Sequence, residues 1–162
     1  LARHSWKEIA MFRCLCLVAL VSLSVFVSPV RSEKVDMSAE DLRKTATHIV
    51  TGQVVAVYER TESDGDWKYT RYVAEVRVAE CEKGDGLKKG DLVYIRYWRR
   101  GWQGKGNAKP DTSGHRDLPG DGSTIRAYLA RNAYDGFGET KDGGFNVLGA
   151  NGFEKLKQAT SK

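Results

Sequence analysis

The sequence predicts a small, mainly β domain, in which five strands form a barrel or sandwich after one short helix. Three observations lead to this prediction. Five segments alternate apolar and polar residues with a period of two. Glycine-containing turns separate them, and all 17 glycines lie after residue 33, about twice the ordinary frequency of about 7%. No long helical pattern lies between the segments, so alternating β–α units are excluded.

The first elements are a short helix and a long strand. Ser38 can cap a helix over residues 38–46, because an acidic residue, Asp41, follows three positions later. The next segment, 48–59, is rich in β-branched residues and is predicted to be the first strand. Residues 63–66 (SDGD) are typical of a turn and would end it.

The second and third strands show the clearest alternation. In the segment 71–78, apolar residues alternate with charged ones, which predicts one face on the core and one in water. A glycine-rich connection, 83–90, leads to the third strand at 91–99. There Val93, Ile95 and Tyr97 are expected to face inward.

The remaining chain supplies two further strands and two loops. The expected elements are a long loop at 100–123, a strand at 124–131, a loop at 132–142, a strand at 143–150, and a tail from Phe153 that is either a short helix or a frayed end.

Several short motifs resemble those of exported bacterial domains with the five-stranded OB-like barrel of the TIMP/netrin family. They are Gly-x-Val at Gly52, Lys83-Gly84 at a strand end, and Gly-Asp-x-Val from Gly90, with residues 127–129 and 144–147 fitting the last two strands. The resemblance implies an OB-like antiparallel barrel. The metalloprotease inhibitors of that family use an N-terminal cysteine, which the expected mature N-terminus at Glu33 lacks, so their mechanism does not carry over.

Residues 11–32 have the build of a secretory signal peptide. Arg13 provides a positive start, an apolar run extends from Leu15 to Val27, and Val30-Arg31-Ser32 offers small residues at cleavage spacing. The run is shorter than the roughly 20 residues of a membrane span, although an uncleaved anchor stays open. We therefore predict a secreted or periplasmic protein. Residues 1–10 are interpreted as an over-extended gene start, or alternatively a long n-region, and residues 33–162 as one domain.

Removal of this leader changes the net charge of the chain and the number of its cysteines. The whole chain has a net charge of +5. Without residues 1–32, 26 − 4 = 22 basic and 21 − 1 = 20 acidic residues remain, which leaves +2. A role in nucleic-acid binding is therefore not expected. Cys81 alone remains after cleavage, so no intramolecular disulfide is expected; a small half-buried strand residue and a reactive thiol both stay open.

The candidate binding surface lies on the third strand and the loop after it. If Val93, Ile95 and Tyr97 face the core, their neighbours face outward and place aromatic rings beside guanidinium groups. Such a ladder suits flat or anionic ligands. The alternative is that the loop covers the tryptophans, which would then only stabilise the barrel. The predicted ligand-binding residues are Tyr94, Arg96, Trp98, Arg99, Arg100 and Trp102.

Metal and catalytic sites receive less support from the sequence. Four residues of the long loop carry possible metal donors, at a spacing that matches no established metal loop: Asp111, His115, Asp117 and Asp121. No hydrolase or phosphate-binding motif is present. We therefore expect no enzyme activity, no cofactor and no stable membrane span. The expected function is an exported binding module for an unknown ligand, such as a glycan or acidic cell-surface polymer; the alternative is a structural or inhibitory protein-interaction domain.

Overall fold

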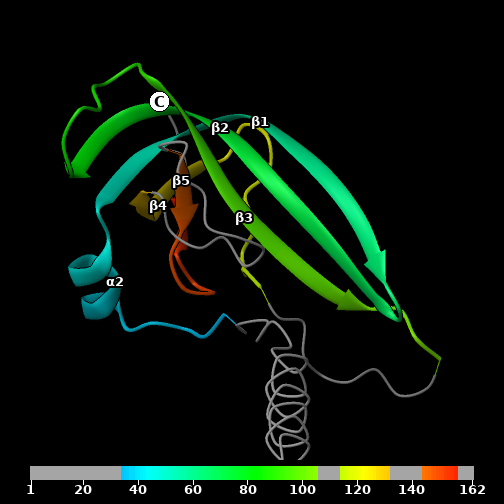
Figure 1. Ribbon diagram of the computed structural model, residues 1–162. Helices are drawn as coiled ribbons and strands as arrows, with labels where there is room; N and C mark the ends of the chain where they lie inside the picture. The colour runs from blue at the N-terminus through cyan, green and yellow to red at the C-terminus, as the bar shows by residue number, and fades with distance from the viewer. Residues whose placement is uncertain (1–33, 106–113, 132–143, 157–162) are drawn as a thin grey trace, which may run out of the picture. The chain divides into compact units, whose positions relative to one another are not determined.

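The structure is a computed structural model that describes residues 34–105, 114–131 and 144–156 (Figure 1). Its elements are α2 (Ala39–Thr45), β1 (His48–Asp64), β2 (Trp67–Lys83), β3 (Leu92–Trp102), β4 (Thr124–Arg131), β5 (Phe145–Val147) and β6 (Phe153–Leu156). The mainly β fold with a short helix before the strands is confirmed. The predicted signal peptide and the predicted loop at 132–142 lie outside the described residues.

Five strands close into a barrel in the order β1-β2-β3-β5-β4, with β4 pairing back onto β1. All of these pairings are antiparallel except β3–β5, which run parallel. β6 pairs with the free half of the β4 edge and lies outside the closed ring. The tail from Phe153 is thus a strand, and its prediction as a helix or frayed end was wrong. Phe153 explains this, because its side chain packs into the barrel core.

The barrel core consists of side chains from alternate positions of all five strands. Ala74, Val76 and Ile95 are completely buried, as the period-two pattern predicts. A second, smaller cluster joins α2 to the barrel wall through Leu42, Ile49 and other apolar residues. Ser38 begins the helix as predicted, since its hydroxyl accepts a hydrogen bond from the Asp41 amide at 3.0 Å.

β1, β2 and β3 are longer than the barrel requires. β1 pairs with β4 only from His48 to Gln53, yet it pairs with β2 as far as Asp64. β3 pairs with β5 only at Ile95 and Arg96 but follows β2 as far as Trp102. The three strands therefore continue as a three-stranded extension, 55–64, 67–73 and 97–102, visible as the long curved arrows in Figure 1. All three strands are longer than the sequence predicted, and the second, predicted over 71–78, extends furthest beyond its predicted bounds.

Candidate functional site

The candidate surface is the face of the β1–β2–β3 sheet that points away from the barrel core, which we call the outer face. Because side chains alternate along a strand, five predicted residues share this face: Tyr94, Arg96, Trp98, Arg100 and Trp102. Arg99 lies on the opposite, inner face with Tyr97. The structure therefore brings together five of the six predicted residues and separates the sixth from them.

The strand register arranges the outer face in rows of three residues. Asp64, Trp67 and Trp102 form the row at the tip of the extension. The next rows toward the barrel are Glu62–Tyr69–Arg100, Arg60–Arg71–Trp98, Tyr58–Val73–Arg96 and Ala56–Glu75–Tyr94. Aromatic and guanidinium groups thus continue onto the neighbouring strands, which the sequence prediction had confined to β3 and its loop.

The tip of the extension holds the most compact part of this surface. The Arg100 guanidinium lies 4.2 Å from the centre of the Trp67 ring, and the Trp67 and Trp102 rings meet edge to face at 5.0 Å. All three side chains are half-buried. Gly104 makes this packing possible, because a Cβ at that position would overlap the Trp102 ring. A guanidinium over the face of an indole ring is the arrangement that cation–π attraction favours.

Trp67 was missed because the sequence places it just after the predicted turn. A two-residue turn, Gly65-Asp66, joins β1 to β2, so Trp67 is already the first residue of the second strand. β3 lies directly beside β2, and this pairing puts Trp102 opposite Trp67. The SDGD turn was the available signal, since a turn closed at Gly65 makes Trp67 a strand residue.

Trp98 lies on the outer face but is not available to a ligand, as it is only 5% exposed. Two residues of the long loop pack against it. The His115 amide donates to the Trp98 carbonyl at 2.8 Å, and the two rings meet edge to face at 6.2 Å. Gly114 has a φ of 119°, and a Cβ there would lie 2.6 Å from the Trp98 carbonyl oxygen. The expectation that Trp98 is an exposed stacking platform is therefore corrected.

Two exposed tyrosines lie at the barrel end of the outer face. Tyr58 is 57% exposed and Tyr94 53% exposed. The Tyr58 hydroxyl donates to a Glu75 carboxylate oxygen at 3.4 Å, and this negative charge raises the pKa of Tyr58 above its ordinary value. Tyr58 therefore remains a neutral donor, and both tyrosines are exposed, which suits stacking and hydrogen bonding together.

Acidic residues limit the positive charge of the middle rows. Glu62 contacts Arg60 at 3.1 Å and Arg71 at 3.7 Å. These pairs are exposed, so each contributes little to stability and can exchange for a ligand at small cost. Arg96 lies close to Gly144, where a Cβ would approach its guanidinium within 2.6 Å. The guanidinium at the tip, Arg100, makes its described contact with an aromatic ring instead of a carboxylate.

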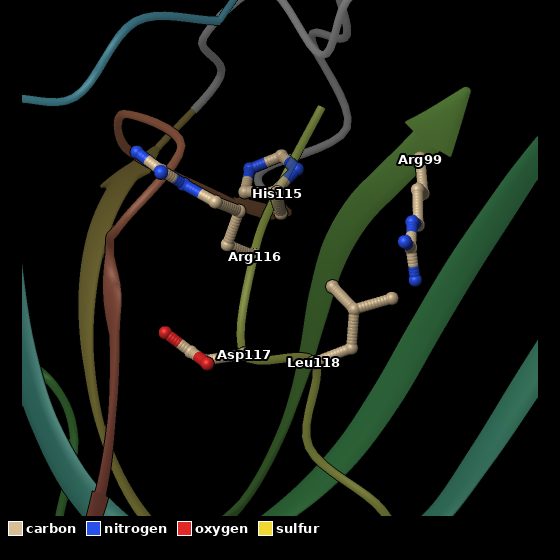
Figure 2. Close-up of a pocket in the computed structure, with 5 residues that line it drawn as sticks. All are labelled: Arg99, His115, Arg116, Asp117 and Leu118. Carbon is tan, nitrogen blue, oxygen red and sulfur yellow. The ribbon is translucent and has the colours of Figure 1, made fainter. Parts of the chain in front are cut away.

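Arg99 lies on the inner side, beside a hollow of about 470 Å³ formed with residues 115–118 (Figure 2). Figure 2 shows that Arg99 extends from β3 on one side of the loop, whereas Arg116 and Asp117 project from the other. Arg116 forms an ion pair with Asp36. Arg99 is thus part of a different surface from the one that holds Arg100.

His115 lies against the part of the β3 edge that β5 is too short to cover. We call this part of the barrel wall the barrel seam. His115 is 3% exposed, with Nε2 3.1 Å from the Val147 carbonyl oxygen and Nδ1 3.1 Å from the Trp98 amide nitrogen. Nδ1 also lies 3.0 Å from the Trp98 carbonyl oxygen. In the neutral ring, a hydrogen on Nε2 satisfies the Val147 carbonyl while Nδ1 accepts from the Trp98 amide. Burial, and secondarily the charge of Lys34, lowers the pKa of His115 to about 4.

Two other side chains of potentially reactive type, His48 and Cys81, are also held by hydrogen bonds within the protein. The His48 nitrogens lie 3.0 Å from the Thr47 hydroxyl and 3.1 Å from the Asp85 carbonyl oxygen. The Cys81 thiol donates to the Lys83 carbonyl at 3.2 Å. Of the predicted metal donors, Asp111 lies outside the described residues, and His115 is engaged as above. Among the residues that the structure describes, no group of three or more metal-ligating side chains comes together.

Two observations complete the description of the site. No helix within residues 34–105, 114–131 and 144–156 has the length and apolar character needed to cross a membrane. The sequence matches no family model, no curated protein and no solved structure.

Proposed function

We propose that this protein is an exported binding module, and that its outer face binds an extended acidic polymer such as a carboxylated glycan. The observation that carries the proposal is the cluster of Trp67, Arg100 and Trp102 at the tip, where the guanidinium lies over the Trp67 ring and the two indoles meet edge to face. Aromatic faces stack on sugar rings, and a guanidinium fork recognises a carboxylate. One short surface thus offers both contacts that an acidic sugar requires.

The length of the surface supports an extended ligand. Tyr94 and Trp102 are eight residues apart on one strand, which corresponds to about 26 Å at the ordinary rise of a strand. The exposed tyrosines would contact the ligand at one end and the tip cluster at the other. The ion-paired arginines between them would exchange Glu62 for ligand carboxylates.

The proposed location and fold class are consistent with this role. A signal peptide at residues 11–32 would place the protein outside the cytoplasm, where acidic polysaccharides occur. The closed five-stranded barrel supports an OB-like class, whose members bind oligosaccharides and oligonucleotides on the barrel surface. The predicted export favours a glycan over a nucleic acid as the acidic ligand.

The proposal is tested by titrating the protein with oligogalacturonate and, as a matched ligand, with its methyl-esterified form, which lacks the charge. We expect tryptophan fluorescence to change with the acidic form. Arg100→Ala should weaken binding about tenfold and reduce its salt dependence, because one charge-assisted contact is lost. Trp102→Ala should also weaken binding about tenfold, with the salt dependence retained, because stacking contributes about 1–3 kcal/mol.

Arg99→Ala is the matched control, since it removes the same charge from the adjacent residue on the opposite face. It should bind like the parent protein. Equal losses for Arg99→Ala and Arg100→Ala would show that only net charge matters and would contradict the proposal. Equal binding of the acidic and esterified oligosaccharides would contradict the role of the arginines.

A further inference from the structure

The outer edge of β1 in the extension offers a strand-pairing surface. β4 covers this edge only as far as Gln53, and the last backbone contacts on it are those of Val54 with the 122–123 loop. From Val55 to Ser63, no pairing on this side occurs within the described part of the chain. Residues 58–61 and Ser63 are exposed, so the edge is open to solvent. An open strand edge is a template for pairing with another chain.

The two-residue turn determines which backbone groups are available. Asp64 and Trp67 flank the turn, so they form a hydrogen-bonded pair and direct their amides and carbonyls toward each other. The register has no irregularity between Ala56 and Asp64. By alternation, the backbone groups of Val57, Glu59, Thr61 and Ser63 point away from β2, toward the open edge.

We propose that this edge pairs with the same edge of a second copy of the chain, in an antiparallel arrangement centred on Thr61. In this register Thr61 lies opposite Thr61 of the second copy, and Glu59 lies opposite Ser63. All of these residues present their backbone groups outward, so every hydrogen bond of the new ladder finds its partner.

The charges of the edge select this register. With Thr61 at the centre, each Arg60 lies opposite a Glu62 of the other copy, and the two pairs are equivalent by symmetry. A shift that centres the pairing on Arg60 or on Glu62 would place like charges directly opposite each other, which is destabilising. The Arg60 side chain is 79% exposed and Glu62 is 41% exposed, so both can contact a partner. A bulge between Val54 and Ala56 limits how far the pairing can extend toward the barrel.

The inference does not depend on the proposed ligand, because dimerisation is measured without one. We expect sedimentation equilibrium to show a monomer–dimer equilibrium for the parent protein. Arg60→Glu alone and Glu62→Arg alone should each raise the dimer dissociation constant at least tenfold, since each creates two like-charge pairs. An equimolar mixture of the two variants should dimerise again, because the mixed dimer restores opposite charges at both positions.

Two further variants distinguish pairing at this edge from the effect of a charge change elsewhere on the surface and from a loss of folding. Lys68→Glu reverses an exposed charge on β2, away from the edge, and should dimerise like the parent. Thr61→Pro removes the central outward amide, which β2 does not use, and should be monomeric with an unchanged circular dichroism spectrum. A monomeric parent at all concentrations, or a mixture of the two charge variants that stays monomeric, would overturn the inference.

Discussion

The barrel and the extension share three strands, but the side chains of these strands are more often buried in the barrel than in the extension. In the barrel, β1, β2 and β3 enclose a core in which Val76 and Ile95 are fully buried. In the extension, no further strand among the described residues closes them into a ring, and β1 becomes exposed from Tyr58 to Thr61. Closure, and not strand composition alone, thus decides which residues form a core and which remain available for binding.

The largest expected difference between the two regions is in how much the free energy of unfolding falls when a side chain is truncated to alanine. Ile95→Ala leaves a cavity at a fully buried position and should lower the free energy of unfolding by about 3 kcal/mol. Val73→Ala, on the half-buried outer face, should cost about 1 kcal/mol or less. Urea unfolding of both variants measures this. Similar losses would show that the outer face is packed as tightly as the barrel.

The next effect concerns pH and the barrel seam. The pKa of His115 is about 4 in the folded protein and 6.5 when unperturbed, so the unfolded chain binds more protons between these values. The stability due to neutral His115 is therefore complete above pH 6.5 and is lost as the pH falls toward 4, by about 3 kcal/mol. Urea unfolding at pH 7 and pH 5, where most carboxylates stay ionised, should show about 2 kcal/mol of this loss. In His115→Gln the difference should be small; an equal difference in this variant would assign it to other groups.

The smallest effect compares two glycines. A Cβ on Gly52, in the barrel wall, would lie 2.5 Å from the Arg77 carbonyl oxygen, whereas one on Gly101, in the extension, would meet no atom within 4 Å. Gly52→Ala should therefore lower the free energy of unfolding by about 1–3 kcal/mol. Gly101→Ala should change it by about 0.5 kcal/mol at most. Melting temperatures of the two variants provide the measurement, and a destabilised Gly101→Ala would show that the extension is packed more closely than described.

The sequence predicted the barrel better than the candidate site, for a physical reason. Alternation along 71–78 and 91–99 identifies which side chains share a face, and Ala74, Val76 and Ile95 are buried accordingly. It does not identify what covers a face. Trp98 was assigned correctly to the outer face, but Gly114 and His115, from a loop without any periodic pattern, pack against it.

Short-range patterns also failed where long-range contacts decide the structure. Phe153 to Leu156 has no alternation long enough to predict a strand, and its pairing with β4 supplies the hydrogen bonds that make it one. The seam role of His115 has no local signal either, because its partners, Trp98 and Val147, are 17 and 32 residues away. Trp67, in contrast, could have been found from the tight turn before it.

The continuity of β1 and β2 has a consequence for the order of folding. Asp64 pairs with Trp67 across a two-residue turn, whereas closure of the barrel requires His48 to meet Leu129. Short loops close quickly and at low entropic cost, and long ones close later. The hairpin of the extension should therefore form early and act as the nucleus on which β3 is added. The barrel closes only after β4 has been synthesised, so the surface proposed for binding would exist, in part, before the core that supports it.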